Sequence, residues 1–247
     1  MKDTIQVTSL APSDALSPFI ESYWMIRNPS DQDEELVTFP DGGIDVYFFS
    51  SNEFPLFVSL VGLETQKQQG IMPKRSVLMG VRLNLLAVEY LLKRSVADIL
   101  NDNATLASGY AGIEQNDVHD FNGFCKKLER YFTSQLDQPI DSRKRIMSDL
   151  IYQTNGTITV SDIAQSANWS CRQINRYFNK WLGLPLKNYC DILRFRHSFD
   201  SLKEGELYPE DGFNDQSHYI KLTKKYSSLT PKQLAHDKSD RFIQLSS

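Results

Sequence analysis

Residues 162–189 read DIAQSANWSCRQINRYFNKWLGLPLKNY, and this stretch decides how the rest of the chain is interpreted. Apolar residues recur at three- and four-residue steps on both sides of the polar turn at Asn168 and Trp169, which predicts two short amphipathic helices. Ser170, with Gln173 three residues later, has the pattern of a capping box at the start of the second helix. Gly183 is expected to end that helix. Two short helices joined by a tight turn form a helix-turn-helix.

The outer side of the second helix carries polar residues suited to DNA. Arginine can donate two bonds to guanine, and Asn or Gln can pair with adenine. Residues 170–190 contain no Asp or Glu, so no carboxylate in this stretch repels phosphate. An ordinary helical hairpin with a solvated polar face is the alternative. The residues predicted on this outer side are Arg172, Gln173, Asn175, Arg176 and Lys180.

A second pattern of the same kind follows an expected long helix over residues 187–202. Residues 212–234 read GFNDQSHYIKLTKKYSSLTPKQL, in which Asn214 or Asp215 is placed to cap a helix. Thr230 and Pro231 have the cap and first-turn proline of a closing helix. The side chains that this second motif is expected to expose are Gln216, Ser217, His218 and Lys221.

The two ordered patterns, covering roughly residues 141–236, resemble the double helix-turn-helix of the AraC/XylS family of transcription regulators. The resemblance implies that the second helix of each motif enters a DNA major groove, about one helical turn apart on the same face. Arg172, Gln173, Asn175 and Arg176 would then read the first groove, and Gln216, Ser217, His218 and Lys221 the second. Phosphate contacts, which position the protein without specifying sequence, are assigned to Lys180, Lys187, Lys224 and Lys225.

The second motif departs from the family pattern. The family has a full supporting helix before Gly-Phe, whereas here KEGELYPED (203–211) fills that space with Gly205 and Pro209 inside it. Thr223 stands where a buried Phe is usual, and Ser228 where a Gly is usual. We therefore expect the first motif to carry most base recognition and the second mainly to hold the DNA backbone.

The first half of the chain predicts strands. Residues 37–49 (VTFPDGGIDVYFF) contain a turn signal followed by apolar residues on alternate positions, and residues 54–65 and 76–86 are further β-type runs. PDGGID and MGVRL resemble segments of a family subgroup whose first domain is a small β-barrel. Residues 87–100 and 118–136 look helical. The expected fold is α+β: a mainly-β small barrel with following helices over residues 1–137, and an all-α AraC-type DNA-binding domain over residues 138–247.

Charge is divided unevenly between these halves, although the net charge of the whole chain is only −4. Residues 1–140 hold 11 Lys and Arg against 19 Asp and Glu, whereas residues 141–247 hold 16 against 12. An acidic first half beside a basic second half suggests that the second half alone contacts phosphate. We expect a cytoplasmic protein without a membrane partner. The three cysteines are widely spaced, and no apolar run has the ~18–20 residues that a membrane span needs. The sequence also has no signal-peptide core.

The role of the first domain stays open between three interpretations: a sensor for a small-molecule effector, a dimerisation or partner module without a ligand, or an enzyme. Residues 1–118 contain no His and no Cys, which disfavours metal catalysis, so we expect no catalytic residue, no metal and no cofactor. Asp41 and Asp45 are interpreted as turn and strand-edge residues. Core packing, with a ligand pocket as the alternative, is expected for Tyr23, Trp24, Phe39, Tyr47 and Phe49, beside Arg82.

We expect the protein to be a homodimer, because regulators of this kind bind paired DNA sites. The apolar stripe of residues 118–136 is a candidate for the dimer seam. Packing of that stripe against its own domain is the alternative.

Overall fold

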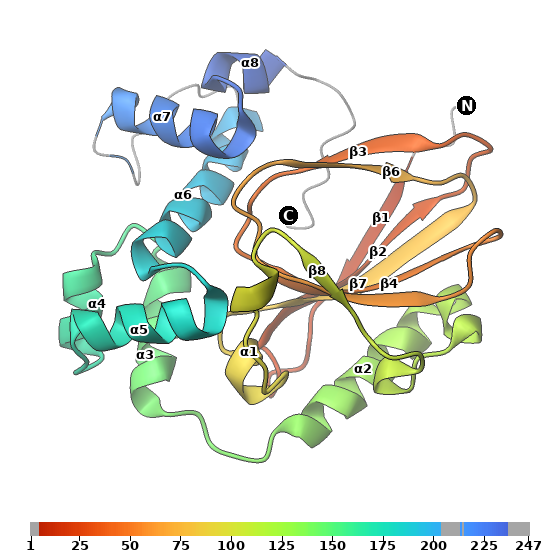
Figure 1. Ribbon diagram of the computed structural model, residues 1–247, viewed down its shortest axis with the longest axis horizontal. Helices are drawn as coiled ribbons and strands as arrows, with labels where there is room; N and C mark the ends of the chain where they lie inside the picture. The colour runs from red at the N-terminus through yellow and green to blue at the C-terminus, as the bar shows by residue number, and fades with distance from the viewer. Residues whose placement is uncertain (1–4, 204–212, 214, 237–247) are drawn as a thin grey trace.

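A computed structural model describes residues 5–203, 213 and 215–236, and it divides into a part built of strands and a part built of helices (Figure 1). An antiparallel β-sheet domain comes first and a helical domain follows, which confirms the predicted α+β class. No helix among the described residues is both long and apolar enough to cross a membrane.

The strand domain contains two sheets. The larger has six strands in the order β1 (Gln6–Leu10), β2 (Ile20–Asn28), β7 (Ser76–Leu83), β4 (Ile44–Ser51), β5 (Phe57–Val61) and β8 (Asn103–Thr105). The smaller pairs β3 (Glu34–Thr38) with β6 (Gln68–Met72). The smaller sheet lies across one face of the larger sheet, and α2 (Phe121–Gln135) lies beneath the other (Figure 1).

Alternation along the strands separates the two faces of the larger sheet. Val46 and Phe48 point to the α2 side, as the sequence pattern predicted, and the Phe48 ring meets Phe124 of α2 edge-on at 5.1 Å. Phe124, Leu128 and Phe132 of α2 are fully buried there. The amphipathic stripe of α2 therefore packs against its own domain and is not available as a dimer seam.

The other face carries a buried ion cluster between the two sheets. Asp45 on β4 lies opposite Arg82 on β7 in the strand register, and an Arg82 Nη contacts Asp45 Oδ2 at 2.9 Å. Arg82 also pairs with Asp41, and Trp24 Nε1 donates to Asp45 at 3.0 Å. Asp41 does accept from the Gly43 amide, as a turn residue should, but both carboxylates are chiefly partners of a buried arginine. The interpretation of Asp41 and Asp45 as turn and strand-edge residues was therefore incomplete.

Residues 87–100 form less helix than the sequence predicted. Only α1 (Ala87–Tyr90) and a short 3-10 turn, η1 (Ala97–Ile99), are present, and Lys93 between them has a φ of 52°. Ser95 Oγ donates to the carbonyl of Lys180 at 2.7 Å, and the Val96 amide donates to the carbonyl of Trp181 at 3.0 Å. These bonds to the end of another helix replace the helical bonds that local periodicity suggested.

The helical domain contains α3 (Ser142–Gln153), α4 (Val160–Ser166), α5 (Cys171–Leu182), α6 (Leu186–Lys203), α7 (Gln216–Ser227) and α8 (Pro231–His236). The caps predicted for α5 are confirmed, because Ser170 with Gln173 forms a reciprocal capping box at its start. At the start of α3, Asp141 accepts from the Arg143 amide. Gly183 ends α5 in the left-handed region, at a φ of 78°.

The turn of residues 40–43 docks the strand domain onto α6. Tyr189 donates its hydroxyl proton to the Gly42 carbonyl at 3.0 Å, and Phe39 packs on Phe199 with ring centroids 5.4 Å apart. Gly42 has a φ of +80°, and a Cβ there would lie 2.8 Å from Leu193 of α6, so this close approach requires glycine. One apolar cluster consequently runs through both domains.

Two ion pairs also join the domains. Arg196 of α6 pairs with Glu21 of β2, and Lys144 of α3 contacts Glu89 of α1 at 2.7 Å. The Tyr152 and Tyr189 hydroxyls, 2.8 Å apart, continue the contact from α3 to α6. The α3–α6 unit is thus fixed to the strand domain by polar as well as apolar contacts.

Substitution of Arg82 should test how far this buried ion cluster stabilises the fold. We expect Arg82→Met to lower the free energy of unfolding by about 3–5 kcal/mol, because it leaves buried carboxylates without their cation. Arg75→Met is the matched control: Arg75 pairs with Asp31 at 2.5 Å, but both side chains are more than half exposed, so the expected loss is below about 1 kcal/mol. Urea unfolding of both variants measures the difference, and equal losses would contradict this role of Arg82.

Candidate nucleic-acid interface

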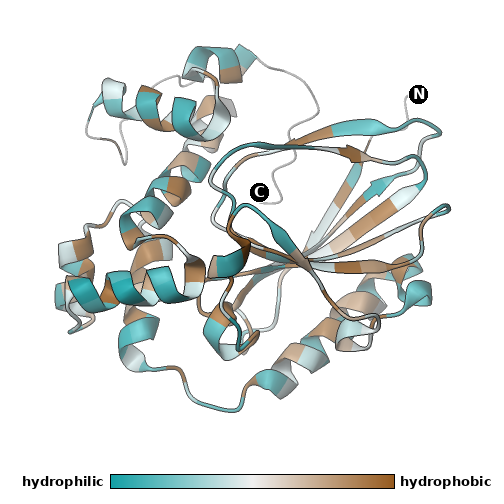
Figure 2. Cartoon of the chain, viewed as in Figure 1, coloured by the Kyte–Doolittle hydropathy of each residue, from teal (hydrophilic) through white to brown (hydrophobic). Residues whose placement is uncertain are grey.

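The helix-turn-helix of α4 and α5 presents a polar outer face. Ile174, Tyr177 and Phe178 are buried against the rest of the domain, whereas Arg172 and Arg176 are exposed on the opposite side of α5. Figure 2 shows mostly hydrophilic residues along this outer side. The spacing of buried and exposed positions is that of one amphipathic helix resting on its motif.

Two of the predicted base readers on α5 are already used inside the motif. Gln173 Oε1 accepts from the Ser170 amide at 3.0 Å as part of the capping box. Asn175 Oδ1 accepts from the Leu186 amide at 3.2 Å, and its Nδ2 donates to the Cys171 carbonyl at 3.0 Å, so this side chain links α5 to the start of α6.

The two arginines of α5 differ from these amides. In the described part of the chain, neither Arg172 nor Arg176 forms an ion pair or a side-chain hydrogen bond. Both guanidinium groups are therefore available to donate hydrogen bonds to a binding partner.

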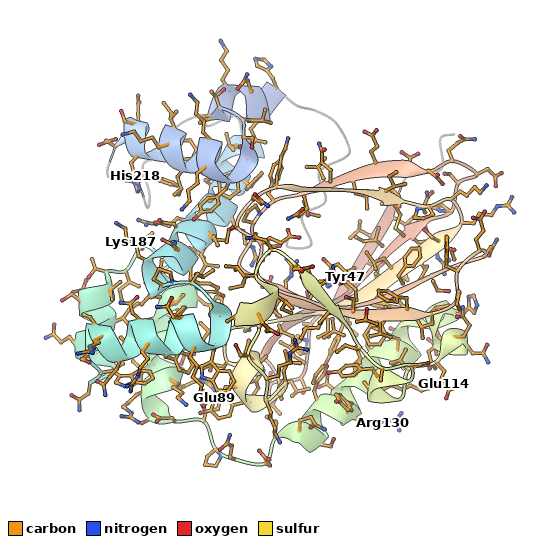
Figure 3. All side chains as sticks on the ribbon, viewed as in Figure 1. Tyr47, Glu89, Glu114, Arg130, Lys187 and His218 are labelled. Carbon is orange, nitrogen blue, oxygen red and sulfur yellow. The ribbon has the colours of Figure 1, made fainter. Side chains whose placement is uncertain are left out.

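Lys180 and Lys187 lie near the junction of α5 and α6. The Lys180 ammonium stands 4.6 Å from the centre of the Trp181 ring, and Lys187 is exposed in the first turn of α6. Figure 3 shows Lys187 and His218 on the same side of the molecule, away from the sheets. In the view of Figure 1, the N-terminal turns of α5 and α7 also lie on that side.

In the second motif, Asp215 caps α7 by accepting from the His218 amide at 2.7 Å. His218 is half-buried, with its ring centroid 5.9 Å from that of Phe213. Lys225 folds back over the ring of its neighbour Tyr226, at 4.6 Å. The predicted residues of this motif that are exposed are Gln216, Ser217, Lys221, Lys224 and Lys225.

The support of α7 has the two weak points that the sequence suggested. Thr223 is fully buried, and among the described residues its hydroxyl has no hydrogen-bond partner. Ser228 ends α7 in the left-handed region, with a φ of 63° that glycine adopts more easily. The segment proposed to replace the supporting helix, residues 204–211, lies outside the described residues.

The space between the two sheets is almost filled. Trp24 and Phe39 are buried, and so is Tyr23 on the opposite, α2 side of the larger sheet, in agreement with their assignment to the core. A remaining hollow of about 20 Å³ has room for roughly one water molecule. It is lined mainly by polar side chains: Thr38, Asp41, Asp45, Tyr47 (labelled in Figure 3), Glu64 and Arg82. No group of three or more His, Cys, Asp or Glu that could hold a metal ion occurs within the described ranges.

Charge around this hollow is unevenly compensated. Burial opposes the ionisation of Asp41, but the charges of Arg82 and Arg196 outweigh it and lower the pKa of Asp41. Burial raises the pKa of Asp45 despite its pairing with Arg82. Burial, together with the charges of Asp41 and Asp45, raises the pKa of Glu64 to about 7.

The sequence analysis did not single out Glu21, Glu64 or Arg196, which surround this cluster. Glu21 and Arg196 lie 175 positions apart, so no local pattern links them. Asp45 and Arg82 could have been recognised from the sequence, because each is a charged residue between two buried apolar residues of a strand. Opposite charges in such strands predict a cross-strand pair once the strands are known to be neighbours.

Replacing Glu64 should change how stability depends on pH. Because its pKa is higher in the folded chain than in the unfolded chain, folding binds a proton between these two values, and the free energy of unfolding falls as pH rises through about 5 to 7. We expect Glu64→Gln, which cannot ionise, to lose less stability between pH 5 and pH 8 than the original chain. Glu53→Gln, on an exposed loop, is the matched control. Parallel pH profiles of Glu64→Gln and the original chain in urea unfolding would contradict the assignment.

Comparison with known proteins gives matches to a family model, to a curated relative and to solved structures. Residues 8–105, which include most of the strands, match a family described as "Domain of unknown function (DUF6597)". A curated relative, the uncharacterized HTH-type transcriptional regulator YbfI of Bacillus subtilis (strain 168), is 31% identical over 92 residues. The match covers 35% of this chain and 33% of the relative, so the chain spans about a third of the length of this relative.

Among solved structures, the chain is similar to ToxT from Vibrio cholerae. A structure of ToxT with a bound unsaturated fatty acid matches with a TM-score of 0.44 at 12% identity, covering 97% of each chain. Another structure of ToxT matches with a TM-score of 0.43 at 12% identity, covering 94% of this chain and 97% of the other.

Proposed function

We propose that this chain is a sequence-specific DNA-binding transcription regulator of the AraC/XylS kind. The observation that carries the proposal is the outer face of α5, where two arginines without partners in the described chain stand on a well-capped helix-turn-helix. The absence of Asp and Glu from residues 170–190 leaves this face open to phosphate. The name of the curated relative agrees with this class of function.

Within the first motif, we assign base recognition chiefly to Arg172 and Arg176. A guanidinium can donate two bonds to guanine, and these two are free to do so. Gln173 and Asn175 remain candidates only through groups that their internal bonds leave unused, such as the Gln173 amide protons. Lys180 and Lys187 are assigned to phosphates.

The second motif is assigned to the DNA backbone. Its exposed lysines, Lys221, Lys224 and Lys225, offer charge, and phosphate recognition tolerates a less rigid helix than base recognition does. The buried unpaired hydroxyl of Thr223 and the positive φ of Ser228 both weaken the packing that would fix α7.

The strand domain, together with α2, is proposed as the regulatory part, with the division from the DNA-binding part near residue 137. Because it contacts α5 and α6 directly, a change in this domain can alter the position of the proposed DNA-binding helices. A small-molecule effector is the proposed input. The filled space between the sheets offers no preformed site for one, so any effector site has to lie elsewhere on this domain.

Selection of duplexes from a random-sequence DNA library, at moderate salt, tests the regulator proposal. We expect an enriched motif. Arg176→Ala should relax sequence preference at about one position, costing about 1–3 kcal/mol there, whereas Lys221→Ala should weaken binding to all sequences and reduce the salt dependence by about one phosphate contact.

Arg130→Ala, on the outer side of α2 (Figure 3), removes the same charge away from the proposed interface and should leave binding unchanged. A greater loss of specificity from Lys221→Ala than from Arg176→Ala would reverse the roles assigned to the two motifs. Absence of enrichment, both for the full chain and for residues 138–247, would overturn the proposal.

A dimerisation module without a ligand is the second candidate for the strand domain, and the filled interior favours it. With the stripe of α2 buried, one available edge is β1, whose five residues are all exposed and include Val7 at 50% and Leu10 at 45% exposure. Sedimentation across a range of concentrations should then detect a dimer that Leu10→Lys weakens. A monomer at every concentration would remove this candidate.

A further inference from the structure

A second hollow, of about 390 Å³, lies at the end of the larger sheet away from α6. It is bounded by the last residues of β2 and β4, the first residues of β7, and the 3-10 helix η3 (Gln115–His119), which follows Glu114 in Figure 3. Its volume falls in the range of small-molecule sites, about 300–1,000 Å³. The side chains that decide its chemistry are Arg27, Ser50, Arg75, Val77, Val118 and His119.

Arg27 interrupts an otherwise apolar face. Successive rows of side chains across β2, β7 and β4 point toward α2, and the row at this end contains Arg27, Val77 and Ser50. Continued alternation would place an apolar side chain at position 27. The two preceding rows are Met25, Met79 and Phe48, and then Tyr23, Val81 and Val46.

The hollow has positive charge and no lining carboxylate. Arg75 and His119 stand at its rim, and neither Asp nor Glu lines it. Arg75 is engaged with Asp31 at 2.5 Å, so its charge is partly compensated. Arg27, by contrast, is half-buried, and it has no acidic partner in the part of the chain that the structure describes.

A hydroxyl donor lies in the same row as Arg27. Ser50 is only 4% exposed, and its oxygen accepts from Gln115 Nε2 at 2.7 Å. This bond occupies the oxygen as an acceptor and leaves the hydroxyl proton to be donated. Gln115 is itself held by the Leu56 amide, which donates to Oε1 at 2.6 Å, so the wall formed by η3 is fixed to the sheet.

We propose that this hollow is a binding site for a small organic oxyanion, a carboxylate or phosphate group carried on a short hydrocarbon body. Arg27 holds the oxyanion with two parallel N–H···O bonds, and the Ser50 hydroxyl donates a third. Val77 and Val118 contact the hydrocarbon part. The proposal for this site does not depend on whether the protein binds DNA. In a regulator, the ligand of this site would be the effector.

Titration of the full-length protein with sodium benzoate and with inorganic phosphate, followed by chemical-shift changes, tests the proposal. Both anions should produce saturable shifts at Arg27 and along η3, whereas benzamide, the uncharged analogue of benzoate, should not. Arg27→Gln should weaken benzoate binding about tenfold or more, and Arg27→Lys should weaken it less, because it keeps the charge but loses the paired bonds.

Arg130→Gln is the matched control, since it removes an arginine from the exposed side of α2 and should leave the affinity for benzoate unchanged. The melting temperature of each variant without ligand shows whether it is folded. Equal binding by Arg27→Gln and the original chain would overturn the proposal, because Arg27 would then merely extend into water. No saturable shift from either anion up to about 10 mM would overturn it as well.

Discussion

The arrangement of the molecule depends on the ion cluster that Arg82 forms with Asp41 and Asp45 between the two sheets. Asp45 and Arg82 lie on adjacent strands, whereas Asp41 lies in the turn that follows β3. Burial makes each of these charges costly alone, so Arg82 can satisfy its two partners only if the turn stays against the sheet. The turn fixed in this way is the one whose Gly42 carbonyl receives the Tyr189 hydroxyl of α6. The buried guanidinium of Arg82 therefore stabilises both the packing inside the strand domain and the surface that contacts the helical domain.

The two helix-turn-helix motifs are attached to that surface differently. The C-terminal end of α5 is held directly, because Ser95 and the Val96 amide bind the carbonyls of Lys180 and Trp181. The main contacts of α7 are with α6 and α8, and Tyr226 meets Phe195 of α6 at 5.4 Å. The strand domain thus sets the position of the first motif directly and reaches the second through α6.

Local features of this structure could be predicted from the sequence, and features that join distant residues could not. The caps at Ser170 and Gly183 were predicted, because the Ser170 side chain binds a backbone group three residues away and glycine readily adopts the left-handed conformation that ends a helix. The helix expected over residues 87–100 was largely wrong, since the Ser95 hydroxyl and the Val96 amide bind the end of α5 instead. Among the candidate readers of α5, sequence gave the right outer face but could not show that Asn175 is bonded to the start of α6. That bond depends on how two helices meet after the chain turns at Gly183.

The same distinction explains why a ligand pocket remained open in sequence as the alternative to core packing inside the strand domain. Aromatic residues beside an arginine are common to binding sites and to cores, and only packing separates the two. Here Trp24 donates to Asp45, and the Trp24 ring meets Tyr47 edge-on at 5.1 Å, so the aromatic residues complete the environment of the buried ions. The hollow between the sheets has room only for about one water, whereas a larger hollow lies where the alternation of the sheet is broken, at the row of Arg27, Val77 and Ser50. Arg27 and Val77 of that row lie at one end of strands β2 and β7. Glu21 and Arg82 lie at the other end of the same strands, where Glu21 pairs with Arg196 of α6 and Arg82 pairs with Asp41 of the turn. The strands that form the open hollow are therefore also strands that contact the helical domain.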